Sequence, residues 1–542
     1  MPQDFVPLAE MIVDAVLETS PALAGFVGDH RFDDRMPDLS PDGVAADVAM
    51  LRDADSALSA VDPDALVGED RVDHEMLQSL VERALFELTE VREHEWNPLE
   101  HNPGTLLYNL IARPYAPAEQ RLTALAVRLA AIPDLLATAR TVLTDCPLVH
   151  LETAIGQFTG TGALIRDEMR PLLEEAPELA ETVEPLRRQA VRELGTFVGW
   201  LREQAEVAQA AGGGRDPRLG RRIWEAKLWH TLDTELPATE VIARAQANLD
   251  RVTAEMRELA AKMTGAPATD ETVRAVLGRI AEEHPDNTSI VDLAKVTMEE
   301  TTAFVRDHEL VSLVDDPCVI MEMPEFARGV AVAYCDPRGP LETADVPTYY
   351  CIAPTPEDWP AERVASFYRE YNNAMVRNLT VHEAMPGHYL QLAHSRRFRG
   401  STRVRAVGLS GPFVEGWAVY AEEMMIEYGF GGDAVRMQQL KMQLRMSINA
   451  ILDQLVHCAE LPEADGMALM TGRGFQEEGE AAGKWRRALL TATQLSTYFV
   501  GYTEVSAIGR ARPQGVSLQE WHDRMLAHGS PPPRHLRALL GV

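Results

Sequence analysis

Cysteine, lysine and long hydrophobic runs are scarce in this sequence of 542 residues. The five cysteines are scattered and form no CxxC pair, which argues against a disulfide framework and against a cysteine zinc site. No apolar run reaches the roughly 18 residues of a transmembrane helix. The first Lys or Arg is Arg31, whereas a secretory signal carries basic residues earlier. Together these absences predict a protein of the cytoplasm.

Positive charge is also scarce. The chain has 51 Lys and Arg residues against 83 Asp and Glu residues, so its formal net charge is −32. An acidic surface repels nucleic-acid phosphates and anionic lipids, and we therefore expect neither nucleic acid nor a membrane as a partner. Hydrophobic residues make up 46% of the chain and charged residues 25%, which is typical of a globular protein with a sizeable core.

Helical spacing dominates both ends of the sequence. Across residues 1–310, apolar side chains recur every three or four positions, for example at Leu125, Leu129 and Ile132. The same spacing returns at about residue 361, runs straight into the histidine motif described below, and continues to the C-terminus. The sequence therefore predicts a mainly α protein.

Between these helical parts lie short segments that are rich in β-branched and aromatic residues and are separated by Pro and Gly. They span residues 318–326, 329–337 and 348–354. We predict that they form a small antiparallel sheet ahead of the metal-site helix. The predicted organisation is a helical N-terminal part, residues 1–310, which forms one wall of a cleft, and a catalytic part, residues 311–542.

Two short motifs carry metal-binding chemistry. Residues 382–388 read HEAMPGH, and residues 415–422 read EGWAVYAE. Two imidazoles and one carboxylate can hold zinc and leave a fourth position open for water. In the common zinc helix the two histidines are four residues apart. Here they are six apart, and in a regular helix His388 would point about 120° away from His382.

Pro386 and Gly387 offer a way to close this gap. Proline has no amide hydrogen, and its ring clashes with the carbonyl four residues back, which is that of His382. Glycine permits backbone angles that are closed to other residues. A break at this point could bring His388 back beside His382. The sequence therefore predicts that the helix deforms between Glu383 and His388.

The second motif supplies the third ligand. Glu415 and Glu422 are seven residues apart, so they lie on one face of a helix. One can bind the metal while the other orients a ligating imidazole. Glu415 is favoured as the ligand because Gly416 follows it and permits close backbone approach, and Glu422 or Glu423 is the alternative. The strands matter as well, since the edge of a sheet can bind an extended peptide.

Several polar residues further along the chain are candidates for the rest of a site. Tyr498 and Tyr502 are one helical turn apart and are either donors to a developing oxyanion or core aromatics. Asp453 and His457 share a helix face, either as a pair that lines a cleft or as a buried hydrogen bond. The candidates for substrate binding are Arg445, His457, Arg510 and His528.

The chain resembles the bacterial domain-of-unknown-function family numbered 885 over nearly its whole length. The resemblance implies a largely helical, zinc-dependent hydrolase similar in style to the helical metallopeptidases. It also implies His382 and His388 as ligands, Glu383 as base and a Glu within 415–422 as third ligand. One departure is Thr491–Gln494, where the family tends to have Pro-Gly-Gln. The matching stretches are GDHRFDDRMPDLS, RLAAIPDLLATAR, MPEFARGVAVAYCDP, YYCIAP, HEAMPGHYLQ, EGWAVYAEEM, YFVGYTE and WHDRMLAHGSPP.

These observations lead to one hypothesis and two alternatives. The hypothesis is a zinc hydrolase that cleaves an amide bond in a small peptide or peptide-like substrate, with Glu383 as base and Tyr498 or Tyr502 at the oxyanion. Manganese, cobalt or iron would also suit this donor set. The first alternative is a zinc enzyme of specialised metabolism, such as an amidase, lyase or dehydratase. The second is a metal-free helical binding protein. The sequence leaves open the substrate, the end from which it is cut and the oligomeric state.

Overall fold

The computed structural model describes residues 5–323, 332–356 and 359–542, and the chain forms two compact units. The N-terminal unit comprises Met1–Pro217 together with two later segments, Arg338–Val346 and Gly400–Gly408. The C-terminal unit comprises the rest of the chain.

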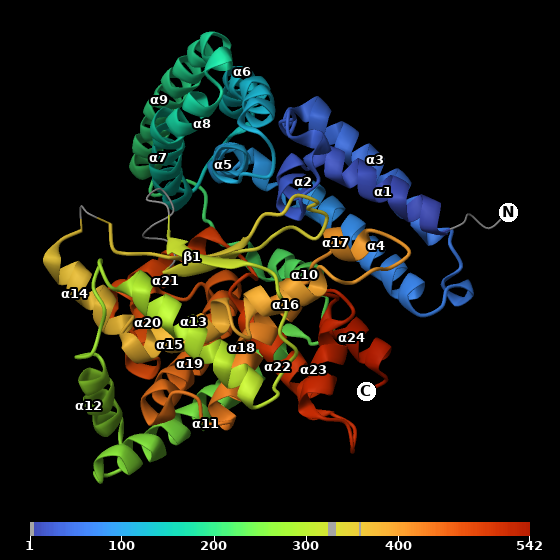
Figure 1. Cartoon of the computed structure of the whole chain (residues 1–542). Coiled ribbons are helices and arrows are strands. Elements are labelled where there is room, and N and C mark those ends of the chain that lie inside the picture. Colours follow the sequence, from blue (N-terminus) through green and yellow to red (C-terminus); the bar gives the residue numbers. More distant parts are fainter. Residues whose placement is uncertain (1–4, 324–331, 357–358) are drawn as a thin grey trace. The chain divides into compact units, whose positions relative to one another are not determined.

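Helices build the N-terminal unit (Figure 1). The centre of its core is α6, whose residues Leu122, Leu125 and Leu129 are buried. Within the described part of the chain, α6 is the one helix that is long and apolar enough to cross a membrane, but these side chains pack inside the unit. The helices are α1 (Phe5–Thr19), α2 (Pro21–Val27), α3 (Pro41–Ser59), α4 (Glu69–Phe86), α5 (Gly104–Ala112), α6 (Ala118–Val142), α7 (Leu148–Ala163), α8 (Arg170–Glu175), α9 (Ala180–Ala210) and, from the later segments, α17 (Val404–Val407).

Ion pairs hold the segment of residues 338–346 in the N-terminal unit. The carboxylate of Glu342 lies 2.8 Å from Nε2 of His30, and Asp33 lies 3.0 Å from Nδ1 of the same ring. The ring of Tyr115 stacks on His30 at 3.5 Å. Burial alone would lower the pKa of His30, but the two carboxylates outweigh it and raise the pKa to about 9. His30 is therefore charged at neutral pH and clamps residues 338–346.

The His30 clamp predicts a pH-dependent stability. Because the folded pKa of about 9 exceeds the ordinary value of 6.5, the contribution is complete below pH 6.5 and disappears as the pH rises through 9. The side chain is 23% exposed, so we expect at most about 3 kcal/mol. Urea unfolding of the wild type and His30→Gln at several pH values measures this. The difference in midpoint should be largest below pH 6.5; a difference that grows with rising pH would contradict the clamp.

The C-terminal unit is also helical and contains the sheet. Its helices α10–α13 pack with later elements, α11 against α19 and α13 against α15, so the compact units divide at residue 217 rather than at 310. The predicted role of the N-terminal part as a cleft wall stays a prediction. The helices are α10 (Gly220–Leu232), α11 (Ala238–Thr264), α12 (Asp270–Ile280), α13 (Ile290–Asp307), α14 (Ala361–Glu370), α15 (Asn373–Glu383), α16 (His388–Ser395), α18 (Gly411–Glu427), α19 (Gly432–Ala459), α20 (Glu463–Ala468), α21 (Glu478–Leu490), α22 (Ser496–Arg510), α23 (Leu518–Leu526) and α24 (Pro533–Leu540).

The sheet has three strands, β1 (Cys318–Glu322), β2 (Ala333–Asp336) and β3 (Thr348–Ile352), in the order β1-β3-β2. β2 runs antiparallel to β3, but β1 runs parallel to it, so the sheet is mixed and not wholly antiparallel as predicted. β3 lies between the other two strands. Parts of the first two predicted strands, 324–326 and 329–331, lie outside the described residues.

The helix that precedes the histidine motif is shorter than predicted. Helical spacing from residue 361 suggested one continuous helix, whereas α14 ends at Glu370 and α15 begins at Asn373. The side chain of Asn372 accepts a hydrogen bond from the backbone N–H of Met375 at 3.1 Å and so caps α15. The capping residue starts a new helix that ends at the motif.

Candidate metal centre

The histidine motif breaks the helix, as the sequence predicted. α15 ends at Glu383 and α16 begins at His388. Between them the N–H of Gly387 donates to the carbonyl of Val381 at 2.9 Å, which closes a tight loop. The imidazoles of His382 and His388 consequently lie with their ring centres 4.7 Å apart. The predicted deformation is confirmed.

Glycine is required at position 387 because of close backbone approach. A Cβ added there would lie 1.9 Å from the carbonyl oxygen of His382 and 2.3 Å from that of Val381. The φ angle of Gly387 is −70°, so a left-handed conformation is not the reason. The indole N–H of Trp417 also donates to the carbonyl of Pro386 at 2.8 Å and ties the loop to α18.

A second pair of glycines positions the glutamate helix. A Cβ on Gly416 of α18 would lie 2.4 Å from the backbone of Gly501 in α22. These helices therefore pack with their backbones in contact, and the close approach expected of Gly416 is confirmed. The contact places Glu415 on α18 next to the segment of α22 that carries Tyr498.

Three atoms that could bind a metal converge at the broken helix. Oε2 of Glu415 lies 3.4 Å from Nε2 of His382 and 3.5 Å from Nε2 of His388. Two ligands at about 2.1 Å from a tetrahedral zinc are about 3.4 Å apart, which matches this spacing. Oε2 of Glu415 is buried and has no hydrogen-bond partner among the described residues. The donor set and its spacing thus fit a zinc ion.

Glu422 contacts His382 on the side of the ring that faces away from Glu415. One of its oxygens lies 2.7 Å from Nδ1 of His382, and the other accepts from the amide of Asn378 at 2.6 Å. A proton held at Nδ1 leaves the Nε2 lone pair of His382 free to bind a metal. Glu423 points elsewhere and accepts from the hydroxyl of Tyr502 at 2.9 Å. Of the two alternative ligands named from the sequence, only Glu422 contacts a member of the cluster in the described part of the chain.

Glu383 follows His382 and is buried beside the cluster. Burial raises the pKa of Glu383, and the charges of His388 and His382 only partly oppose this. A backbone hydrogen bond from Cys335, in β2, also reaches this carboxyl group. For Glu415, burial alone would raise the pKa, but the two histidines lower it. Glu415 is thus held ionised, while Glu383 keeps its affinity for a proton.

Tyr498 and Tyr502 differ in their surroundings. Tyr498 accepts a hydrogen bond from Nη2 of Arg487 at 3.3 Å, and the same nitrogen donates to Gln494 at 2.7 Å. Burial, followed by the charge of Glu415, raises the pKa of Tyr498, which places this phenol within electrostatic reach of the cluster. The hydroxyl of Tyr502 instead donates a hydrogen bond to Glu423, so of the two candidate oxyanion donors Tyr498 is the one in electrostatic contact with the cluster. Arg487 could not be predicted from the sequence, because no motif distinguishes it.

The candidates for substrate binding have structural partners. His457 bonds through Nε2 to the carbonyl of Ala488 at 3.0 Å and accepts through Nδ1 from the N–H of Leu219 at 3.3 Å, so both ring nitrogens have partners within the fold, and its role in substrate binding stays a prediction. Arg510 pairs with Glu423 at the surface. Arg445 is buried in ion pairs that are described below, and His528 is half-buried after α23.

Asp453 anchors the loop before α22 instead of pairing with His457. Its carboxylate accepts from the indole of Trp224 at 2.9 Å, from the N–H of Thr493 at 3.0 Å and from the hydroxyl of Ser496 at 2.7 Å. Thr493 has a φ of +68°, a left-handed conformation that is uncommon for a β-branched residue. The loop that leads to Tyr498 is thus fixed by a buried carboxylate from α19.

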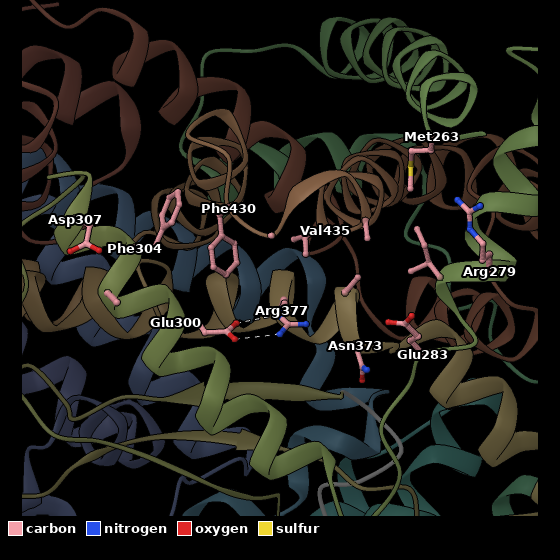
Figure 2. Close-up of a pocket in the computed structure, with 15 residues that line it drawn as sticks. Met263, Arg279, Glu283, Glu300, Phe304, Asp307, Asn373, Arg377, Phe430 and Val435 are labelled. Atoms are coloured by element: carbon pink, nitrogen blue, oxygen red, sulfur yellow. Dashed lines mark hydrogen bonds and ion pairs between the residues drawn. The ribbon is translucent and has the colours of Figure 1, made fainter. Parts of the chain in front are cut away.

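A separate cavity of about 760 Å³ opens elsewhere in the C-terminal unit, and Figure 2 shows its lining. Phe304 and Phe430 form an apolar part, and the ion pair of Arg377 with Glu300 forms a polar part at 3.1 Å. None of the three converging side chains lines this cavity. The cavity and the candidate metal centre are therefore different places on the molecule.

Two solved structures resemble the chain over almost its whole length, and no curated protein matches it. The first, described as "a putative lipoprotein of unknown function from Shewanella oneidensis", is 26% identical with a TM-score of 0.83, and the match covers 99% of this chain and 100% of that one. The second, described as "the putative lipoprotein from Colwellia psychrerythraea", is 17% identical with a TM-score of 0.81, covering 99% and 98%.

These comparisons correct one prediction and establish the family. Lipoproteins carry a lipid anchor, so the description of both structures contradicts the cytoplasmic location predicted from cysteine usage and from the N-terminal sequence. Both signals are indirect, because a protein can lack disulfides in any compartment. One family model, described as "Bacterial protein of unknown function (DUF885)", matches residues 21–540. The chain belongs to this family.

Proposed function

We propose that the chain is a zinc-dependent hydrolase that cleaves an amide bond in a small peptide or peptide-like substrate. The observation that supports this most is the convergence of Nε2 of His382, Nε2 of His388 and Oε2 of Glu415 at the spacing of a tetrahedral site. These three residues would hold the metal. A zinc ion bound there would act as a Lewis acid and lower the pKa of a bound water to about 7.

The neighbouring residues have the placement that such a reaction needs. Glu383 is buried next to His382 and has a raised pKa, so it can take a proton from the attacking water and deliver it to the leaving amine. Glu422 keeps His382 in the tautomer that presents Nε2. Tyr498 can donate a hydrogen bond to the oxyanion as the carbonyl becomes tetrahedral. β2 is an edge strand, and the backbone of its Cys335 forms a hydrogen bond to Glu383. This strand could align an extended peptide.

The proposal is tested first by metal binding. Protein stripped with a chelator and titrated with zinc should take up one ion per chain, and His388→Ala should lose this site because it removes one of the three ligands. Calorimetry measures both. Hydrolysis is then assayed with a mixture of short peptides, followed by mass spectrometry. A wild-type protein that takes up no zinc, or zinc-loaded protein that leaves every peptide intact, would contradict the proposal.

Glu422 and Glu423 offer a matched pair for the same titration. Glu422→Gln removes the charge that fixes His382, and we expect zinc affinity to fall by about 10- to 100-fold. Glu423→Gln changes the adjacent residue, which binds Tyr502 and Arg510, and should leave zinc affinity unchanged. Equal losses in both variants would mean that Glu422 has no special role at the metal.

A further inference from the structure

One face of α21 carries a row of charged side chains towards the candidate metal centre. Glu480, Lys484 and Arg487 are spaced by four and three residues, so they lie on the same side of the helix. At the end of this row, Arg487 donates a hydrogen bond to Tyr498. The charge of Glu415 contributes to the raised pKa of Tyr498. The row therefore leads from the metal cluster along about two turns of helix.

Two carboxylates in this region are already satisfied by two other cations. Glu370 accepts from Lys441 at 2.8 Å and from Arg445 at 3.4 Å. Glu480 pairs with Arg445 and accepts from the hydroxyl of Tyr371 at 3.3 Å. Glu370, Lys441 and Arg445 are all buried. The two carboxylates and the two cations of this group therefore balance each other without Lys484 and Arg487.

Lys484 and Arg487 lie beside these pairs, and the charge of Glu480 acts on Lys484, although Glu480 already pairs with Arg445. Among the described residues, neither forms an ion pair, and the hydrogen bonds of Arg487 go to the neutral side chains of Gln494 and Tyr498. Burial, and then the charge of Arg445, lowers the pKa of Lys484 to about 7. Buried charges in proteins are normally paired. In a chain whose net charge is −32, two half-buried basic side chains that form no ion pair among the described residues suit an anionic ligand, which would also favour the charged form of Lys484.

We propose that Lys484 and Arg487 bind the free C-terminal carboxylate of the substrate, so that the enzyme acts on short peptides as a carboxypeptidase. A guanidinium and an ammonium together suit a carboxylate, because the first offers paired donors and the second a compact charge. The position fits as well. Arg487 contacts Tyr498, which would face the reacting carbonyl, and one peptide residue spans at most about 3.6 Å, so the C-terminal carboxylate would lie only a short distance from that carbonyl. The role of this carboxylate as part of a substrate rests on the hydrolase function proposed above.

The experiment measures binding to zinc-loaded Glu383→Gln protein, which should hold peptides without cutting them. The probe is a fluorescent tetrapeptide, Ala-Phe-Ala-Ala, compared with its C-terminal amide by fluorescence anisotropy. We expect the free carboxylate to bind about 10- to 100-fold more tightly, the effect of a charge-assisted hydrogen bond. Adding Lys484→Gln with Arg487→Gln should remove this preference. Equal binding of the two peptides, or a preference that survives both substitutions, would overturn the proposal.

Three further comparisons make the result specific. Arg524→Gln removes an exposed arginine that pairs with Glu520, and it should keep the full preference; if it loses the preference, the effect is general electrostatics and the proposal fails. An amidated peptide with Glu near its C-terminus tests a side-chain carboxylate, and binding as tight as that of the free terminus would also overturn the assignment. Lys484→Arg keeps the charge and should keep the preference, which separates loss of binding from loss of folding.

The outcomes also separate this inference from the proposed function. If zinc binds and peptides are hydrolysed but free and amidated termini bind equally, the carboxylate site is wrong and the hydrolase stands. If the preference exists and depends on Lys484 and Arg487 but no peptide is cut by the wild type, the hydrolase is wrong and an anion site remains.

Discussion

Replacing Glu383 by Gln is expected to lower kcat for amide hydrolysis by about 10²- to 10⁴-fold while zinc still binds. The amide has nearly the shape of the carboxylate but cannot accept a proton from water. Glu383 is not among the three converging ligands, so its loss should not empty the site. Steady-state kinetics and a zinc titration on the same preparation give both numbers.

A variant that lacks one of the proposed metal ligands should behave differently from Glu383→Gln. His382→Ala should lose zinc and hydrolysis together, because it removes a ligand, whereas Glu383→Gln should lose hydrolysis alone. Full activity in Glu383→Gln would show that the proton is handled by another group. Loss of zinc in that variant would instead place Glu383 among the ligands.

The second large effect is expected at Gly387. Changing it to Ala places a Cβ 1.9 Å from the carbonyl oxygen of His382, and both contacting atoms are backbone that cannot rotate away. The loop must open, which moves His388 away from His382. We expect zinc affinity to fall by at least about 100-fold and the free energy of unfolding to fall by about 1–3 kcal/mol. Calorimetry with zinc and chemical unfolding of the metal-free protein measure the two effects separately.

Gly483 provides the matched control for this substitution. It lies within α21, and a Cβ there would meet nothing within 4 Å, so Gly483→Ala should be neutral or slightly stabilising. Zinc affinity should be unchanged. If Gly387→Ala behaved like Gly483→Ala, the loop would not depend on backbone contact, and another cause for the return of His388 would be needed.

Much of the site was predictable because its residues are close in sequence and obey local rules. The clash of Pro386 with the preceding turn predicted the broken helix, and the spacing of Glu415 and Glu422 predicted a shared face. Both features appear in the structure. The mainly α fold followed for the same reason, since the periodicity of apolar residues is a local signal.

Features that depend on distant contacts were not predictable in this way. The parallel pairing of β1 with β3 depends on which strand inserts between the others, and no local spacing records it. The segments Arg338–Val346 and Gly400–Gly408 join the N-terminal unit through partners such as His30, hundreds of residues away. Arg487 and Lys484 form no ion pair among the described residues because Glu370 and Glu480 pair with Lys441 and Arg445, which come from a different helix, α19. A sequence shows which charges exist, and only the fold shows which remain unpaired.

The left-handed Thr493 makes the geometry near the candidate metal centre dependent on α19, the helix that carries Asp453. A non-glycine residue in this conformation costs about 1–3 kcal/mol and persists only while its surroundings hold it. Here the carboxylate of Asp453 accepts a hydrogen bond from the N–H of Thr493 and so stabilises the strained backbone of this loop. The next residue, Gln494, carries the hydrogen bond that steadies Arg487. Replacing Asp453 would therefore relax the backbone and, with it, the positions of Arg487 and Tyr498 beside the candidate metal centre.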